Sequence, residues 1–313
     1  MYTIFTDTDC DFTPLDVAEY GIKLISMPYS IDGKTIYPYE DFQEFDAHSF
    51  YETLRNGVVP TTSAIPKERY LNYFEPEFQN GRDILYLHFS SAMSATFASM
   101  KEAVEDLKQR YPERSFYSAD TGGISILSRN IVKEALELCA AGREPWEIAE
   151  WVEKEKNHFA VYFFADDLRF FRRSGRVSGL AATMGTVLGV RPIIYVNDEG
   201  RMVSIGKERG KANATERLLH TVEELGKDLS KHRILIGHTD RGTLRRIDRT
   251  LRKRASDRMP CRESHRRKPL RPFHRRHLLL CKTPLTFSEK GKATIRHVEP
   301  GPLGARSRWV FFL

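Results

Sequence analysis

An apolar segment, a hydroxyl-rich turn and a helical segment follow one another between residues 83 and 107, and this order constrains the fold more than any other feature. Residues 83–87 are mostly apolar and predict a buried strand, whereas residues 96–107 have the composition of a helix. Four serines and a threonine lie in residues 90–99. Free backbone N–H groups and the helix dipole favour an anion at such a turn. A helix cap needs only one hydroxyl, so we favour a carboxylate- or phosphate-binding role over capping alone.

Further strands and helices alternate along the chain. We expect strands at 3–5, 22–31, 115–118, 159–164, 193–196 and 233–237, and helices at 15–20, 45–54, from 67, 131–141, 145–155, 166–171, 179–189 and 212–225. This alternation predicts an α/β fold in which helices cover the faces of a sheet. The length suits two α/β domains, which we place at residues 1–157 and 158–313.

The net charge of +7 is unevenly distributed. Residues 241–313 hold 21 Lys and Arg against 5 Asp and Glu, a net charge of +16; the totals of 49 and 42 leave 28 and 37 for residues 1–240, a net charge of −9. Nucleic-acid binding is therefore a weak hypothesis, because the basic charge is confined to a tail with few aromatic residues and the rest of the chain is acidic.

The sequence shows no signal peptide and no apolar run long enough for an integral membrane segment. The four cysteines are scattered without a CxxC pair, which favours a reduced, cytoplasmic protein. His274, His277 and Cys281 have spacing that suits zinc, but no second half-site accompanies them. We therefore expect neither a metal nor a cofactor.

Asp7 and Asp9 follow the first strand and suggest one alternative function, a Mg²⁺-dependent phosphate-ester hydrolase. In such enzymes one aspartate attacks phosphorus and the second acts as acid and base. Asp11 departs from that pattern, and no downstream aspartate pair completes it. A carboxylate-rich turn that caps backbone amides is the simpler interpretation. For His88, which precedes the hydroxyl-rich turn, a structural role is favoured over a Ser/His hydrolase because Gly-x-Ser-x-Gly is absent.

Several short motifs together resemble the DegV family of bacterial fatty-acid-binding proteins over most of residues 1–240. They are TDTDCD at 6–11, PTTS at 60–63, SSAMSAT at 90–96, DLRFF at 167–171 with SGR at 174–176, GVRPI at 189–193 and KERG at 207–210. Each motif alone is weak, but their order and spacing together are specific.

The resemblance implies two α/β domains with a long-chain fatty acid buried between them in an apolar cavity. Its carboxylate would be held by the hydroxyls of Thr62 and Ser94, in agreement with the anion site inferred above. Some family members are the lipid-carrying subunit of a fatty acid kinase and present the acid to a separate ATP-binding subunit, which makes the acyl-phosphate. The chain would then be a lipid-binding protein with no catalytic residue of its own. Arg173, Arg176 and Arg209 are candidates for docking that partner, although a solvated basic loop at 172–176 is an equal alternative.

Two positions depart from the family pattern. Ala95 and Ser174 each stand where the family has glycine, and Ala95 would be strained if its position required a positive φ. The closing block of the family is degraded around His297, so we assign that residue no ligand role.

Residues 241–295 are expected not to be the sequence with which this fold evolved. They are rich in arginine and lack helical or strand periodicity, yet residues 310–313 again resemble a buried strand of the family. A compensated frameshift would produce such a segment, which we expect to be irregular. A genuine basic tail for an acidic membrane surface or nucleic acid is the alternative.

Overall fold

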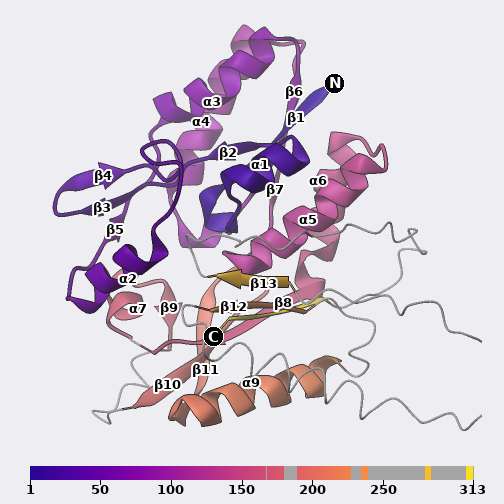
Figure 1. The fold of residues 1–313 in the computed structure, drawn as a ribbon. Helices are drawn as coiled ribbons and strands as arrows, with labels where there is room; N and C mark the ends of the chain where they lie inside the picture. Colours follow the sequence, from indigo (N-terminus) through magenta and orange to yellow (C-terminus); the bar gives the residue numbers. More distant parts are fainter. Residues whose placement is uncertain (167, 180–188, 227–233, 239–278, 283–307, 313) are drawn as a thin grey trace, which may run out of the picture.

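The computed structural model describes residues 1–166, 168–179, 189–226, 234–238, 279–282 and 308–312 (Figure 1). Its first sheet has four parallel strands in the order β2-β1-β6-β7. Their bounds are β1 Tyr2–Asp7, β2 Lys23–Ile25, β6 Asp83–His88 and β7 Phe116–Asp120. The predicted strand–turn–helix unit is confirmed, because β6 leads through a hydroxyl-rich turn into a helix.

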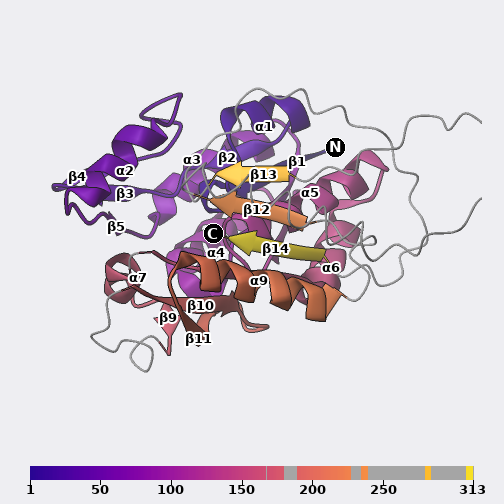
Figure 2. The same cartoon turned by 60° about the horizontal axis from the view of Figure 1, so that its bottom comes forward.

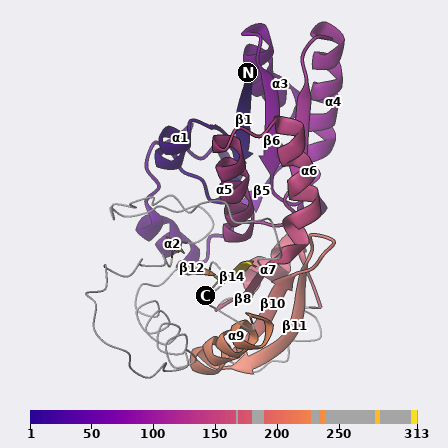
Figure 3. The same ribbon diagram turned by 90° about the vertical axis from the view of Figure 1, so that its right-hand side faces the viewer.

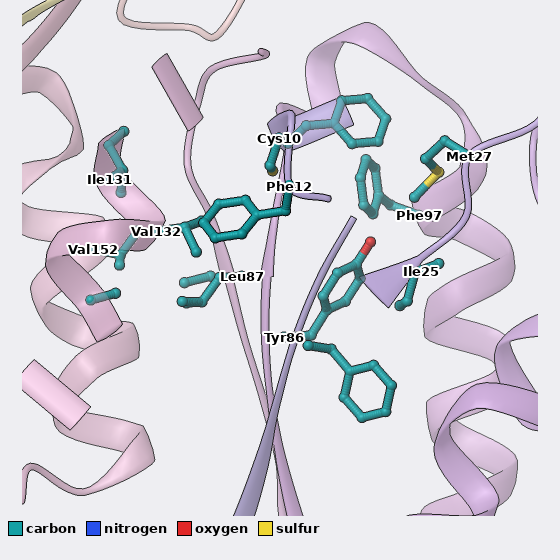
Figure 4. Close-up of a cluster of buried hydrophobic side chains, with 14 of the residues drawn as sticks. Cys10, Phe12, Ile25, Met27, Tyr86, Leu87, Phe97, Ile131, Val132 and Val152 are labelled. Carbon is teal, nitrogen blue, oxygen red and sulfur yellow. The ribbon is translucent and has the colours of Figure 1, made fainter. Parts of the chain in front are cut away.

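Helices cover both faces of this sheet. They are α1 Pro14–Tyr20, α3 Lys67–Gln79, α4 Thr96–Arg110, α5 Ile126–Ala140 and α6 Pro145–Glu155, with short 3-10 turns η1 Thr8–Cys10, η2 Ser91–Met93 and η3 Lys156–His158. Helix α3 packs on β6 and α4, and α6 packs on β6 and β7 (Figure 3). Figure 4 shows Val132 and Val152 on one side of the strands and Phe97 on the other. Burial of both faces explains why Tyr86 and Leu87 are both fully buried although they are adjacent in β6.

A small antiparallel sheet extends from this domain (Figure 1). Its order is β4-β3-β5, with bounds β3 Tyr29–Ile31, β4 Lys34–Ile36 and β5 Thr61–Thr62. Helix α2, Ala47–Arg55, lies between β4 and β5 in the chain, and its Phe50 ring meets the Tyr29 ring edge-on at 5.7 Å. The single strand predicted at 22–31 is wrong, since it is divided into β2 and β3 around Pro28.

The second sheet is mixed and has seven described strands in the order β13-β12-β14-β8-β10-β11-β9 (Figure 2). The strands are β8 Phe159–Phe164, β9 Val177–Ser178, β10 Val190–Val196, β11 Met202–Arg209, β12 Ile234–His238, β13 Leu279–Lys282 and β14 Arg308–Phe312. Helix α7, Arg169–Ser174, lies between β8 and β9 in the chain, and α9, Lys211–Gly226, packs on β10 and β11. Helix α5 contacts β8, β12 and β14, so it lies between the two sheets (Figure 1).

The α/β prediction is confirmed, and several details change. The predicted helix at 212–225 corresponds to α9, where Leu218, Leu219 and Val222 are buried but Leu225 is exposed. The predicted helix at 179–189 lies mostly outside the described residues. So does most of 241–295, although four of its residues form β13, contrary to the expected irregularity, because they include a short apolar run.

A strand near the end of the chain is confirmed by β14, which pairs with both β12 and β8. The strands of the first sheet precede residue 157 and those of the second follow it, but the domain boundary itself stays a prediction. Among the described residues, no helix has the length and apolar character to cross a membrane.

Candidate functional site

The hydroxyl-rich turn lies at the carboxyl end of β6. This strand has neighbours on both sides, β1 and β7, and all three are parallel, so the loops that follow them gather at one edge of the sheet. Ligands of α/β proteins bind preferentially at such an edge. The candidate site therefore begins with the hydroxyls of η2 and the first turn of α4.

Three of these hydroxyls already have protein partners. Ser90 Oγ donates to the Gly200 carbonyl at 2.8 Å, and Ser91 Oγ donates to the Asp120 carboxylate at 2.6 Å. Thr96 Oγ1 accepts the Ile65 N–H at 3.0 Å. These three side chains hold neighbouring segments in place and are not the ones left to bind a ligand.

Ser94 differs from them. Its Oγ accepts the N–H of Thr96, the first residue of α4, at 3.2 Å, and among the described residues no acceptor takes its hydroxyl proton. The side chain is half-buried at the helix N-terminus. Ser94 can therefore donate one hydrogen bond to an anion beside the positive end of the helix dipole.

Ala95 causes no strain in this turn. Its φ is −80° and its ψ is −2°, an ordinary right-handed conformation. The expected penalty for alanine in place of the family's glycine is therefore absent, because the position does not require a positive φ.

Thr62 lies at the end of β5, opposite Tyr29 of β3, with its side chain exposed. The loop after it reaches the hydroxyl-rich turn three residues later, where the Ile65 N–H donates to Thr96 Oγ1. This hydrogen bond ties the segment that carries Thr62 to the turn that carries Ser94. Their joint contact with one carboxylate stays a prediction.

Asp7 lies beneath the turn and is fully buried. Its Oδ2 accepts the Tyr86 hydroxyl and the Phe89 N–H, each at 3.1 Å. Burial, together with repulsion from Asp9, raises the pKa of Asp7 to about 8. The carboxyl group is therefore mostly protonated at pH 7, which makes it a poor nucleophile.

Asp9 is also in a desolvated position. Burial raises its pKa to about 6, an effect that the positive charge of Arg176 opposes. No group of three or more His, Cys, Asp or Glu side chains in the described part of the chain could hold a metal ion. The hydrolase alternative, which needs an ionised Asp7 and a Mg²⁺ site, is thus unsupported.

His88 is buried at the end of β6. Its Nδ1 lies 2.7 Å from the Phe89 carbonyl oxygen, and its ring centroid is 4.2 Å from that of Phe97. Burial lowers the pKa of His88, so the ring is neutral at pH 7. These contacts agree with the structural role favoured from the sequence.

The three candidate docking arginines are exposed but do not form one compact cluster. Arg176 precedes β9, which pairs with β11 at Met202, and its Nε donates to the Met93 carbonyl at 3.3 Å. Arg209 lies at the other end of β11, about 20 Å from Met202 along the strand. Arg173 lies in the last turn of α7. A partner that contacts all three arginines would have to span that length.

A contact between Ser90 and Gly200 joins the first and second sheets' segments of the chain at this turn, and the sequence did not predict it. Gly200 lies in the turn between β10 and β11 with a φ of +72°, and a Cβ atom there would be 2.3 Å from Ser90 Oγ. The Asn-Asp-Glu-Gly sequence predicts the turn, but no local signal indicates that the turn packs against Ser90, 110 residues away.

Comparison with known proteins finds matches to one family, both in a family model and among curated relatives. The family model described as "Uncharacterised protein, DegV family" matches residues 1–267. A DegV domain-containing protein of Clostridium perfringens is 33% identical over 239 residues, which are 76% of this chain and 82% of the relative. One from Streptococcus pyogenes is 26% identical over 247 residues, 79% of this chain and 85% of the relative.

Solved structures share the fold. A fatty-acid-binding DegV family protein from Thermus thermophilus has a TM-score of 0.68 at 21% identity and covers 90% of this chain and 92% of its own. A stearic acid-binding protein from Eubacterium ventriosum has a TM-score of 0.71 at 17% identity, with coverages of 82% and 88%. With the family match over residues 1–267 and the 33% identity to a curated member, the comparisons establish that this chain belongs to the DegV family.

Proposed function

We propose that this protein binds a long-chain fatty acid whose carboxylate is held by Ser94 and Thr62 and whose acyl chain lies in an apolar interior. The observation that carries the proposal is the state of the Ser94 hydroxyl, which keeps a proton to donate at the N-terminus of α4. Neutral hydroxyls and helix-terminal amides suit a single carboxylate, because each hydrogen bond is strengthened by the ligand's charge.

The family comparison supports the same ligand class. The solved relatives from Thermus thermophilus and Eubacterium ventriosum are described as binding a fatty acid and stearic acid, respectively. For this chain the fatty acid is part of the proposal, as are the two-hydroxyl carboxylate site and a cytoplasmic location.

In this proposal the protein carries the acid and presents it to a separate ATP-binding kinase subunit, which forms the acyl-phosphate. Arg173, Arg176 and Arg209 are the proposed docking residues, supported by their exposure and positive charge. No residue of this chain is assigned a catalytic role. Pull-down of a fatty acid kinase subunit by the lipid-loaded protein, and its loss in a triple Arg→Ala variant, would test this step.

Mass spectrometry of the purified protein under mild denaturation tests the ligand directly, and a long-chain fatty acid is the expected release product. Thr62→Val and Ser94→Ala should each weaken fatty-acid binding by about tenfold to 150-fold, the equivalent of one charge-assisted hydrogen bond of about 1.5–3 kcal/mol. Thr61→Val and Ser99→Ala are matched controls on the same strand and helix. Unchanged affinity in both site variants would remove the assignment.

A further inference from the structure

Asn130 on α5 is a buried polar group that has no hydrogen-bond partner among the described residues. Its side chain is fully buried, and within that part of the chain neither Oδ1 nor Nδ2 makes a hydrogen bond. The amide offers two donors and one acceptor, and leaving them unpaired in the protein interior is unfavourable. Such a group is typical of a position where something absent from the polypeptide completes the hydrogen bonds.

Helix geometry places Asn130 on the side of α5 that is turned away from the first sheet. Ser128 Oγ contacts Thr121 Oγ1 at 2.7 Å just after β7, and Cys139 Sγ accepts the Tyr2 hydroxyl of β1 at 3.1 Å. These two contacts mark the side that faces the first sheet. At 3.6 residues per turn, Asn130 lies about 200° around the helix from Ser128. It is therefore on the opposite side.

Helix α5 also contacts the second sheet, through β8, β12 and β14 (Figure 3), and the side turned away from the first sheet is the one free to do so. Val161 of β8 and Leu235 of β12 belong to the same buried apolar cluster as Ile131 of α5. Glu134, one helical turn beyond Asn130, is also buried. A polar side of a central helix thus faces an apolar layer between the two sheets.

We infer that Asn130 binds an oxygen substituent on the acyl chain, so that the preferred ligand is an oxygenated long-chain fatty acid such as a hydroxy acid. This inference rests on the proposed function. A hydroxyl group matches the amide because it can donate to Oδ1 and accept from Nδ2. A carboxylate matches it less well, because it cannot donate to Oδ1. The ligand's own carboxylate is already assigned to the hydroxyls beyond β6.

Competitive binding of C18 acids to the full-length protein tests the inference. Stearate is compared with three monohydroxystearates that carry the hydroxyl near the carboxylate, in the middle and near the tail. At least one isomer should bind about tenfold more tightly than stearate, which corresponds to about 1.4 kcal/mol or one neutral hydrogen bond. Asn130→Leu should abolish that preference while retaining stearate binding. The control Asn213→Leu, at an exposed position of helix α9, should keep it.

The preference of the unaltered protein decides the question even if the leucine variant fails to fold. Stearate binding without preference for any isomer overturns the inference and leaves the proposed function intact. An unchanged preference in Asn130→Leu also overturns it. If an ordered water is the only partner of Asn130, the unaltered protein should bind stearate and the hydroxystearates equally well. Asn130→Leu should then bind stearate more tightly than the unaltered protein, and this result also overturns the inference. Failure to bind any C18 acid would overturn both the inference and the proposed function.

Discussion

The stability advantage of Asp7→Asn over the unaltered protein should grow as the pH rises, because the substitution removes a buried carboxyl group whose ionisation is unfavourable in the folded state. The pKa of Asp7 is raised to about 8 from an ordinary value of 3.8, chiefly by burial. Between these two values the folded chain holds a proton that the unfolded chain has released. Unfolding therefore releases a proton, and the free energy of unfolding falls as the pH rises through this window.

The size of the effect follows from the same two values. One pH unit within the window corresponds to about 1.4 kcal/mol, so at pH 7 the Asp7 carboxyl lowers the free energy of unfolding by about 4 kcal/mol relative to pH 3.8. Asparagine keeps the shape and can still accept from Tyr86 and Phe89 through Oδ1. The stability advantage of Asp7→Asn over the unaltered protein should thus grow by about 3 kcal/mol between pH 5 and pH 7.

Urea unfolding at pH 5, 6 and 7 measures this growth directly. The change with pH is more informative than any single value, because the cost of burying the asparagine amide is the same at each pH and cancels. Asp198→Asn removes one exposed carboxylate and controls for the change in net charge. A pH-independent difference between Asp7→Asn and the unaltered protein would show that Asp7 is ionised in the folded state, contrary to its burial. Mg²⁺-dependent phosphatase turnover that disappears in Asp7→Asn would revive the hydrolase alternative.

Three further sets of substitutions test the geometry around the site, each by urea unfolding. Ser125 has a φ of +57° and a ψ of −135°, so Ser125→Gly should be about 1–3 kcal/mol more stable than Ser125→Ala, since both lose the same hydroxyl but only glycine relieves the strain; equal stabilities would contradict the strain. Gly200→Ala should destabilise the fold by at least about 1 kcal/mol, and Ser90→Gly should recover part of that loss if the 2.3 Å clash is its cause. Arg129→Met should cost about 3–5 kcal/mol because it leaves the buried Asp16 carboxylate without its cation, and a cost below 1 kcal/mol would show that water reaches the pair.

The sequence predicted those parts of the fold that depend on local pattern. The apolar run of β6 and the helix composition after it identify a βα unit, and the hydroxyls between them identify the turn that could bind an anion. Thr13 and Asp16 form a capping box at α1, and Gly21 ends that helix with a φ of +63°. These features lie within a few residues of one another, so they can be recognised without knowledge of the tertiary structure.

Which hydroxyls have protein partners and which remain available for a ligand could not be predicted in this way. Ser90 and Ser91 resemble Ser94 in sequence, but Gly200 and Asp120 occupy their hydroxyls from distant segments. Asp7 likewise resembles a catalytic aspartate in sequence, but in the folded protein it is fully buried. Its neutral state depends on desolvation by segments more than 70 residues away in the chain. Patterns identify which groups are present, whereas long-range packing decides which of them remain available.

The arginine-rich segment at 241–295 lies mostly outside the described residues. The strands that precede and follow it in the chain nevertheless indicate how it arose. β12 and β14 are paired central strands, although 69 residues separate the end of one from the start of the other and only β13 is described between them. The family match covers residue 240 and stops at residue 267, inside the segment. A sequence that belongs to the fold at both ends and departs from it in between is the pattern that a compensated frameshift would leave.

Translating the underlying DNA in its other two frames tests this hypothesis. We expect a change of frame between about residues 240 and 267 and its reversal before β14 at Arg308. The neighbouring frame should encode an amphipathic helix, which the parallel crossover from β12 to β14 requires, and an apolar strand. The net charge of +16 over residues 241–313 should then largely disappear. If only the present frame gives an uninterrupted translation, the segment is a genuine basic tail. Vesicles of anionic lipid should then bind the full chain at low salt and release it at high salt, because the attraction would be electrostatic.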